Sequence, residues 1–132
     1  MIRLTIAVLL SLILGGCTAQ SAPQTIAAQY NKISAEQAKE MMNNAPDYIL
    51  LDVRTDEEFL QSHIEGAMLI PDFEITHRAK AELPDKDVLI LIYCRSGRRS
   101  ALSAQAMVEL GYTNTYDFGG IIDWPYDTVS GE

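Results

Sequence analysis

The sequence is poor in cysteine and in basic residues, and it lacks a long hydrophobic run. Its 132 residues include two Cys, and 10 Lys or Arg against 18 Asp or Glu, for a formal net charge of −8. Two cysteines form at most one bridge, which excludes a miniprotein held together by several disulfides. An acidic chain lacks the cationic face that neutralises phosphates, so we expect no nucleic-acid partner. A content of 48% hydrophobic and 21% charged residues indicates one folded domain and not a disordered chain.

The N-terminus has the pattern of an export signal. A basic start at residues 1–3 precedes an apolar run from Leu4 to Leu14, which is shorter than the roughly 20 residues of a spanning helix. The segment Leu14-Gly15-Gly16-Cys17 resembles the bacterial lipobox, in which the signal is cut before the cysteine. We therefore expect residues 1–16 to be a signal peptide and Cys17 to carry acyl chains such as palmitate. An ordinary secretory leader with a chance cysteine is the alternative.

Removal of the predicted signal peptide changes the net charge of the chain. Cleavage removes 16 of 132 residues and one basic residue, Arg3, so the mature chain is more acidic, at −9. Residues 17–29 carry no charge and are rich in Ala, Gln, Ser and Thr, which predicts a flexible lipidated tether. Residues 30–132 form the predicted domain. We expect a monomer in the cell envelope, anchored by lipid on the extracytoplasmic side of a bacterial membrane.

Within the domain, helical and strand patterns alternate. A capping signal at Ser34 and Gln37 predicts a helix over 34–43. Another, Thr55 before an acidic turn, predicts a helix over 56–61. Two further helices are predicted over 73–83 and 100–110, and strands over 48–53, 67–70, 88–93 and 113–118, the last ended by Gly119-Gly120. The strand over 48–53 is predicted to be buried, and the strand over 88–93 is apolar on both faces, as in the centre of a parallel sheet. The order predicts a three-layer α/β sandwich with a mainly parallel central sheet flanked by helices.

The candidate chemistry lies at Cys94, between the strand over 88–93 and the next helix. Ligands of open α/β sheets bind beyond the carboxyl ends of strands, where helix N-termini face them. There the helix dipole, loop N–H groups and nearby guanidinium charges stabilise a thiolate, and Gly97 permits a tight curl of the loop. Arg95, Arg98 and Arg99 make a local trap for a small anion on an otherwise acidic protein. The alternative is a buried, inert cysteine beside solvated arginines.

The loop Cys94-Arg95-Ser96-Gly97-Arg98-Arg99-Ser100 resembles the active-site loop of rhodanese-type sulfurtransferases. Further matches to that family run from about Tyr30 to Trp124: Ile49-Leu50-Leu51-Asp52-Val53-Arg54, Glu58-Phe59, His63-Ile64-Glu65-Gly66-Ala67, Gly111-Tyr112, Tyr116-Asp117-Phe118-Gly119-Gly120 and Trp124. One departure is Ser62, where the family usually has Gly.

The resemblance implies a double displacement without metal or organic cofactor. Cys94 would take sulfane sulfur from a donor such as thiosulfate as a persulfide, and a thiol or cyanide would remove it. The backbone of residues 95–99, Ser96 and Gly97 included, would bind the anionic groups, and Arg95, Arg98 and Arg99 would orient the donor. Two histidines and one free cysteine do not make a zinc site.

Four further residues receive structural interpretations. Asp52 and Arg54 are expected to form an ion pair that shapes the pocket floor, with a direct substrate role as the alternative. His63 is expected in a hydrogen-bonded turn or in the core, and Trp124 as a lid over the core. His77 lies on a charged helical face and has no assigned role.

Three other functions remain open at this point. A Cys-based phosphatase or arsenate reductase needs five residues between Cys and Arg, whereas four separate Cys94 from Arg99 and Ser100 occupies the position of their Arg. A non-catalytic module would bind an anion or a partner at the cell surface. A persulfide relay would share the chemistry of Cys94 and differ only in its acceptor, a partner protein.

Overall fold

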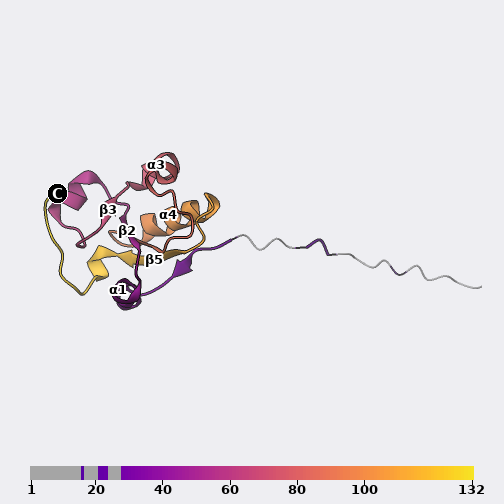
Figure 1. Ribbon diagram of the computed structural model, residues 1–132, viewed down its shortest axis with the longest axis horizontal. Helices are drawn as coiled ribbons and strands as arrows, with labels where there is room; N and C mark the ends of the chain where they lie inside the picture. Colours follow the sequence, from indigo (N-terminus) through magenta and orange to yellow (C-terminus); the bar gives the residue numbers. More distant parts are fainter. Residues whose placement is uncertain (1–15, 17–20, 24–27) are drawn as a thin grey trace, which may run out of the picture.

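The computed structural model describes Gly16, residues 21–23 and residues 28–132 (Figure 1). Most of the predicted signal peptide and tether, including the predicted lipidation residue Cys17, lie outside these residues. Among the helices of the described residues, none combines the length and apolar character that crossing a bilayer requires.

The described domain holds one five-stranded sheet in the order β1-β5-β4-β2-β3, with every neighbouring pair parallel. Its elements are β1 (Asn31–Lys32), α1 (Ala35–Asn44), β2 (Ile49–Asp52), α2 (Asp56–Gln61), β3 (Met68–Leu69), η1 (Asp72–Glu74), α3 (Ile75–Glu82), β4 (Ile90–Cys94), α4 (Arg98–Glu109), β5 (Thr115–Gly120) and η2 (Ile121–Asp123). This arrangement is the predicted α/β sandwich.

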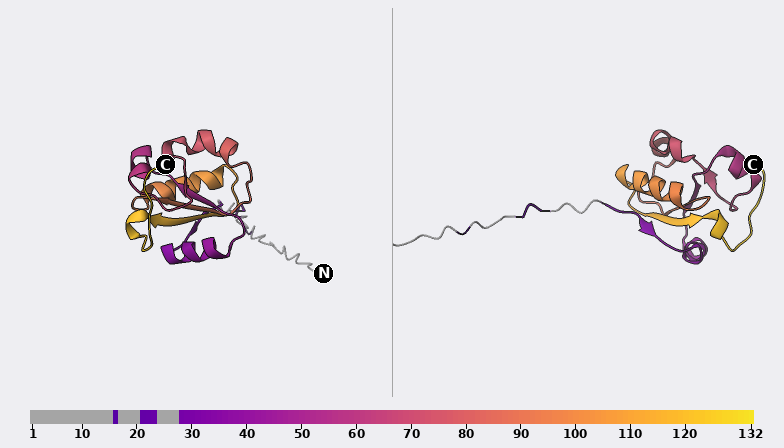
Figure 2. Two further views of the ribbon diagram at one scale, coloured as in Figure 1. Left: turned by 60° about the vertical axis from the view of Figure 1, so that its left-hand side comes forward. Right: turned by 180° about the vertical axis from the view of Figure 1, so that it is seen from behind.

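Helices cover both faces of the sheet, with α1 on one side and α3 and α4 on the other (Figures 1 and 2). Successive residues of a strand point to opposite faces, so each strand contributes to two cores. Leu51, Ile92 and Cys94 belong to the core beneath α3 and α4. Leu50 and Tyr93 belong to the core on the α1 side. The thiol and the neighbouring tyrosine ring therefore lie on opposite sides of the sheet.

The predicted starts of the two helices with capping signals, α1 and α2, are confirmed. The hydroxyl of Ser34 accepts the N–H of Gln37, and the Gln37 side chain accepts the N–H of Ser34. Thr55 and Glu58 form the same reciprocal pair at the start of α2. Each of these reciprocal pairs is a capping box. It provides hydrogen-bond acceptors for two N–H groups that have no partner within the helix, and this fixes where the helix begins.

Two strands differ from the predictions. The short edge strand β1 was not predicted. Gly119 and Gly120, predicted to end the last strand, continue β5 instead. Ile92 pairs with Asp117, but Cys94 pairs with Gly120, so β5 contains one extra residue opposite β4. This bulge, in which Gly119 has φ of 90°, carries β5 alongside the segment that follows Cys94.

Candidate active site

Cys94 is the last residue of β4, and only 1% of its surface is exposed. Its Sγ accepts a hydrogen bond from the backbone N–H of Gly97 at 3.0 Å. The thiol faces the hydroxyl oxygen of Ser100 at 3.5 Å. Ser100, which is fully buried, lies within hydrogen-bond distance of the Gly97 and Gly119 carbonyl oxygens, at 3.1 and 3.3 Å. The sulfur thus has one backbone donor, the Gly97 N–H, and lies beside a buried hydroxyl group.

The curl of the loop depends on Gly97, the N-cap residue of α4. Gly97 has φ of 104°, a left-handed conformation that glycine adopts without a steric penalty. That conformation turns its N–H back onto Cys94 and starts the 12-residue helix α4 at Arg98. The helix therefore starts two residues earlier than predicted, and its positive dipole end adjoins the loop that holds the sulfur.

The bulged end of β5 forms the other side of the loop. A Cβ atom on Gly120 would lie 2.5 Å from Cα of Ser96, and the carbonyl oxygen of Arg95 would be closer still. That same carbonyl accepts the N–H of Ile122 at 3.2 Å. Only a residue without a side chain fits here, so the loop packs directly on the backbone of β5.

The three arginines of the loop are not equivalent. Arg99 makes two hydrogen bonds of 2.8 Å to the carboxylate of Glu58 on α2. The hydrogen bond to Glu58 raises the pKa of Arg99, and the hydrogen bond from Arg99 lowers the pKa of Glu58 to about 2. Arg95 and Arg98 are exposed. The charge available to an incoming anion therefore comes mainly from Arg95 and Arg98, because Glu58 neutralises Arg99.

Asp52 and Arg54 form a buried ion pair, with 2.7 Å between Arg54 Nη2 and Asp52 Oδ2. Burial by itself would lower the pKa of Arg54, but the hydrogen bonds and charge of Asp52 outweigh it and raise that pKa. Asp52 pairs in register with Tyr93, so its side chain lies on the sheet face opposite the Cys94 thiol. Arg54 also donates to the Ser62 carbonyl at 2.6 Å. The predicted ion pair is therefore present, and it braces the end of α2.

The contacts of His63 and of Trp124 are those of structural residues. His63 is buried, stacks on Phe59 with 3.8 Å between ring centroids, and its Nδ1 is 2.9 Å from the Phe59 carbonyl oxygen. Trp124 is 8% exposed and covers Phe118 in the core on the α1 side. His77 is exposed on α3. The structural interpretations of His63 and Trp124 are confirmed.

Sequence reasoning missed two residues that shape the loop, Ser100 and Asp117. Ser100 was placed at the end of the loop and the start of a helix, without a role beside the thiol. Asp117 is fully buried in β5, and its Oδ1 accepts the N–H of Gly119 at 2.9 Å. The only sequence signal for this bulge is a weak one, a polar residue two positions before a pair of glycines.

A profile of the family described as "Rhodanese-like domain" matches residues 34–125, more than half of the chain. The chain belongs to the rhodanese-like family. It is 36% identical over 81 residues to the thiosulfate sulfurtransferase PspE of Escherichia coli. That alignment covers 61% of this chain and 78% of PspE. It is also 36% identical over 95 residues to a sulfurtransferase of Allochromatium vinosum, covering 71% of this chain and 87% of that protein.

Solved structures agree with this assignment. A structure described as "rhodanese with anions from E. coli" matches with a TM-score of 0.61 and 34% identity, covering 64% of this chain and 100% of that chain. A protein of Helicobacter pylori matches with a TM-score of 0.61 and 33% identity, covering 76% and 89%. The predicted family, the α/β sandwich and the sulfurtransferase class of this rhodanese-like domain are confirmed.

Proposed function

We propose that this rhodanese-like domain moves sulfane sulfur through a persulfide on Cys94. The donor is thiosulfate, a persulfide or a polysulfide, and the acceptor is a thiol or cyanide. The observation that carries the proposal is the hydrogen bond of 3.0 Å from the Gly97 N–H to Sγ of Cys94. A backbone donor already directed at the sulfur stabilises a thiolate without reorganisation during the reaction. The relatives named as sulfurtransferases support the same chemistry.

In the first step, the Cys94 thiolate attacks the outer sulfur of the donor. A new S–S bond forms to Cys94 while the S–S bond of thiosulfate breaks, and sulfite leaves with the bonding electron pair. The exposed guanidinium groups of Arg95 and Arg98 attract the dianionic donor and then the departing anion. With only 1% of Cys94 exposed, the site favours attack on a terminal sulfur atom over attack on a bulky centre.

In the second step, an acceptor thiolate or cyanide attacks the outer sulfur of the persulfide. The bond within the persulfide breaks, and the Cys94 thiolate is restored as the leaving group. With cyanide the product is thiocyanate. Each step exchanges one bond to sulfur for another, so the cycle needs no external oxidant or reductant. The Gly97 N–H stabilises the thiolate at the start and at the end of the cycle.

The test is intact-mass analysis of the full chain after incubation with thiosulfate. We expect a gain of one sulfur atom that cyanide removes, with release of thiocyanate. Cys17→Ser is the matched control, because it leaves Cys94 as the only cysteine of the chain and should keep the gain. Cys94→Ser should lose it.

Two outcomes would overturn the proposal. No mass gain with thiosulfate or polysulfide would indicate a binding module without catalysis. Hydrolysis of an aryl phosphate that disappears in Cys94→Ser would indicate a Cys-based phosphatase.

We further propose that the protein is a monomer anchored through acyl chains on Cys17 at the outer side of a bacterial membrane. The apolar run that stops at Leu14-Gly15-Gly16-Cys17 supports this placement. Acyl chains anchor by burying methylene groups, each worth about 0.8 kcal/mol. Labelled palmitate should enter the chain but not Cys17→Ser, which should also leave the membrane fraction and sediment as a monomer. Equal labelling of both chains would refute the anchor.

A further inference from the structure

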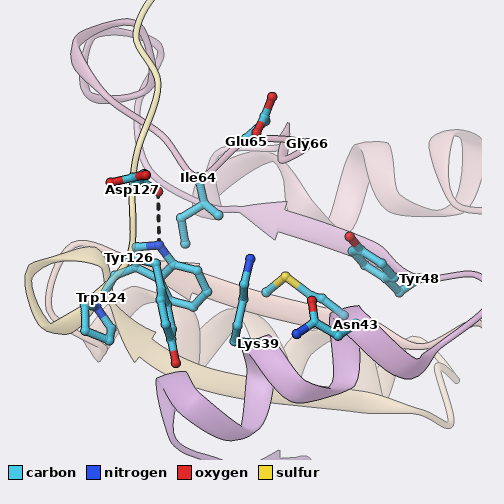
Figure 3. Close-up of a pocket in the computed structure, with 11 residues that line it drawn as sticks. Lys39, Asn43, Tyr48, Ile64, Glu65, Gly66, Trp124, Tyr126 and Asp127 are labelled. Carbon is cyan, nitrogen blue, oxygen red and sulfur yellow. Dashed lines mark hydrogen bonds between the residues drawn. The ribbon is translucent and has the colours of Figure 1, made fainter.

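A cavity of about 720 Å³ lies on the α1 side of the sheet (Figure 3). Its walls come from α1, from Tyr48, from residues 64–66 and from residues 124–127. Ile64 and Trp124, which line it, belong to the core on the α1 side, whereas Cys94 belongs to the core beneath α3 and α4. The cavity has the size of small-molecule sites and is separated from the thiol by the sheet. The sulfur-transfer cycle proposed above does not use this cavity.

One wall of the cavity is an aromatic pair, Trp124 and Tyr126. Their ring centroids are 4.9 Å apart in an edge-on arrangement, and Trp124 also packs on Phe118. The indole N–H of Trp124 donates to the Asp127 carbonyl at 3.3 Å, which links the two ends of residues 124–127 (Figure 3). Trp124 is 8% exposed and Tyr126 is 40% exposed. The pair offers apolar surface that is already ordered, so a ligand would not have to order it.

The cavity also contains a cation, the ammonium of Lys39. Figure 3 shows this group directed into the cavity from α1, above Asn43. Nζ lies 5.6 Å from the centroid of the Tyr126 ring. Among the residues that the structure describes, no carboxylate lies within 4.0 Å of Nζ, so Lys39 forms no ion pair there. Lys39 is a half-buried residue whose ammonium lies over an aromatic ring and forms no ion pair, so it can pair with an anionic ligand.

The two acidic residues at the rim do not serve as that partner. Glu65 and Asp127 are both exposed. The Glu65 carboxylate is directed away from Lys39 in Figure 3. The contact of Asp127 with the pocket wall is made by its backbone carbonyl. Lys39 is therefore the one basic residue among those that line the cavity, and neither acidic residue of the rim forms an ion pair with it.

We propose that this cavity binds a small organic carboxylate with an aromatic or apolar body. The carboxylate would pair with Nζ of Lys39, and the body would pack on Trp124 and Tyr126 beside Met42. An organic cation of the same shape would meet the Lys39 ammonium and be repelled. The site is independent of sulfur transfer, because the sheet lies between it and Cys94.

The experiment uses the fluorescence of Trp124, the only tryptophan of the chain, as a reporter in the cavity wall. The purified full chain is titrated with phenylacetate, with its neutral analogue phenylacetamide and with the cation phenethylammonium. We expect a saturable change with phenylacetate and at least about tenfold weaker binding of the other two compounds, since they lack a charge-assisted hydrogen bond to Lys39.

Two lysine variants test the assigned contact. Lys39→Met keeps the aliphatic stem and removes the charge, and it should weaken phenylacetate binding about tenfold. Lys80→Met is the matched control, because Lys80 is exposed on α3 across the sheet, and it should bind like the unaltered chain. Sulfur transfer should be unchanged in both variants.

Three outcomes would overturn the proposal: no saturable change with phenylacetate, equal binding of phenylacetate and phenylacetamide by the unaltered chain, or tightest binding of the cation. The comparison of ligands on the unaltered chain remains decisive even if Lys39→Met folds poorly. A failure of sulfur transfer would not affect this result, since the two sites are read out separately.

Discussion

Replacement of Gly120 by alanine probes how closely the active loop depends on β5. Gly120 is an extended residue, with φ of −111°, so alanine is compatible with its backbone conformation. The added Cβ atom would lie 2.5 Å from Cα of Ser96, where contacts below 3.0 Å essentially do not occur in proteins. The carbonyl oxygen of Arg95 stands closer still. Because these are backbone atoms, no side chain can rotate away to relieve the contact.

The loop must therefore move by about half an ångström or more, the difference between 3.0 and 2.5 Å. Overpacking of this kind costs about 1–3 kcal/mol in the free energy of unfolding. The same shift displaces the Gly97 N–H from Sγ of Cys94, which it now meets at 3.0 Å. Since a misplacement of 1 Å costs about a hundredfold in rate, we expect Gly120→Ala to lose roughly tenfold or more in kcat/KM.

The assay is thiocyanate formation from thiosulfate and cyanide, measured beside unfolding in urea. Ile90→Val is the control, because Ile90 is fully buried at the opposite end of the same strand as Cys94. It should cost about 1 kcal/mol of stability and leave kcat/KM unchanged. If Gly120→Ala keeps full kcat/KM, or if Ile90→Val loses as much activity at equal stability loss, the claim that β5 shapes the loop is refuted.

Two ion pairs give further predictions. Glu58→Gln keeps the capping box, since Gln also serves at that position, but loses the charge pair with Arg99, at a cost of about 1 kcal/mol at pH 7. Arg99 lowers the pKa of Glu58 from 4.5 to about 2, so the pair stabilises fully above pH 4.5 and loses its effect as the pH falls toward 2. Urea unfolding at pH 7 and at pH 2 should show the difference between the chains shrinking; a constant difference would contradict the pairing. Asp52→Ala leaves Arg54, only 4% exposed, without its partner and should cost about 3–5 kcal/mol in the free energy of unfolding; a loss below 1 kcal/mol in the same measurement would show that Arg54 finds another partner.

Local signals explain why so much of the fold was predictable. The capping residues Ser34 and Thr55 act within one helical turn, so their spacing alone predicts where α1 and α2 begin. The apolar runs of β2 and β4 are long enough to indicate buried strands. By contrast, β1 has two exposed residues and is a strand only because β5 pairs with it. No local pattern carries that information.

The faces of the central strands were not predictable for a related reason. Residues before Cys94 are apolar on both sides, so alternation does not show which helix covers which face. The register of β2 against β4 is also a tertiary property. Without it, the Asp52 side chain could not be placed on the sheet face opposite the Cys94 thiol. The pairing itself was predictable because the partners are only two positions apart in the sequence.

The shape of the active loop depends on residues that lie more than 20 positions after Cys94. Asp117 accepts the Gly119 N–H and so supports the bulge, while the Gly119 carbonyl lies 3.3 Å from the Ser100 hydroxyl that faces the thiol. Asp117 Oδ2 has no hydrogen-bond partner, and Lys32 Nζ is 4.0 Å away. Burying a carboxylate so incompletely satisfied is costly. The loop motif therefore identifies the nucleophile, but the environment of its sulfur is built jointly with β5, which the motif does not include.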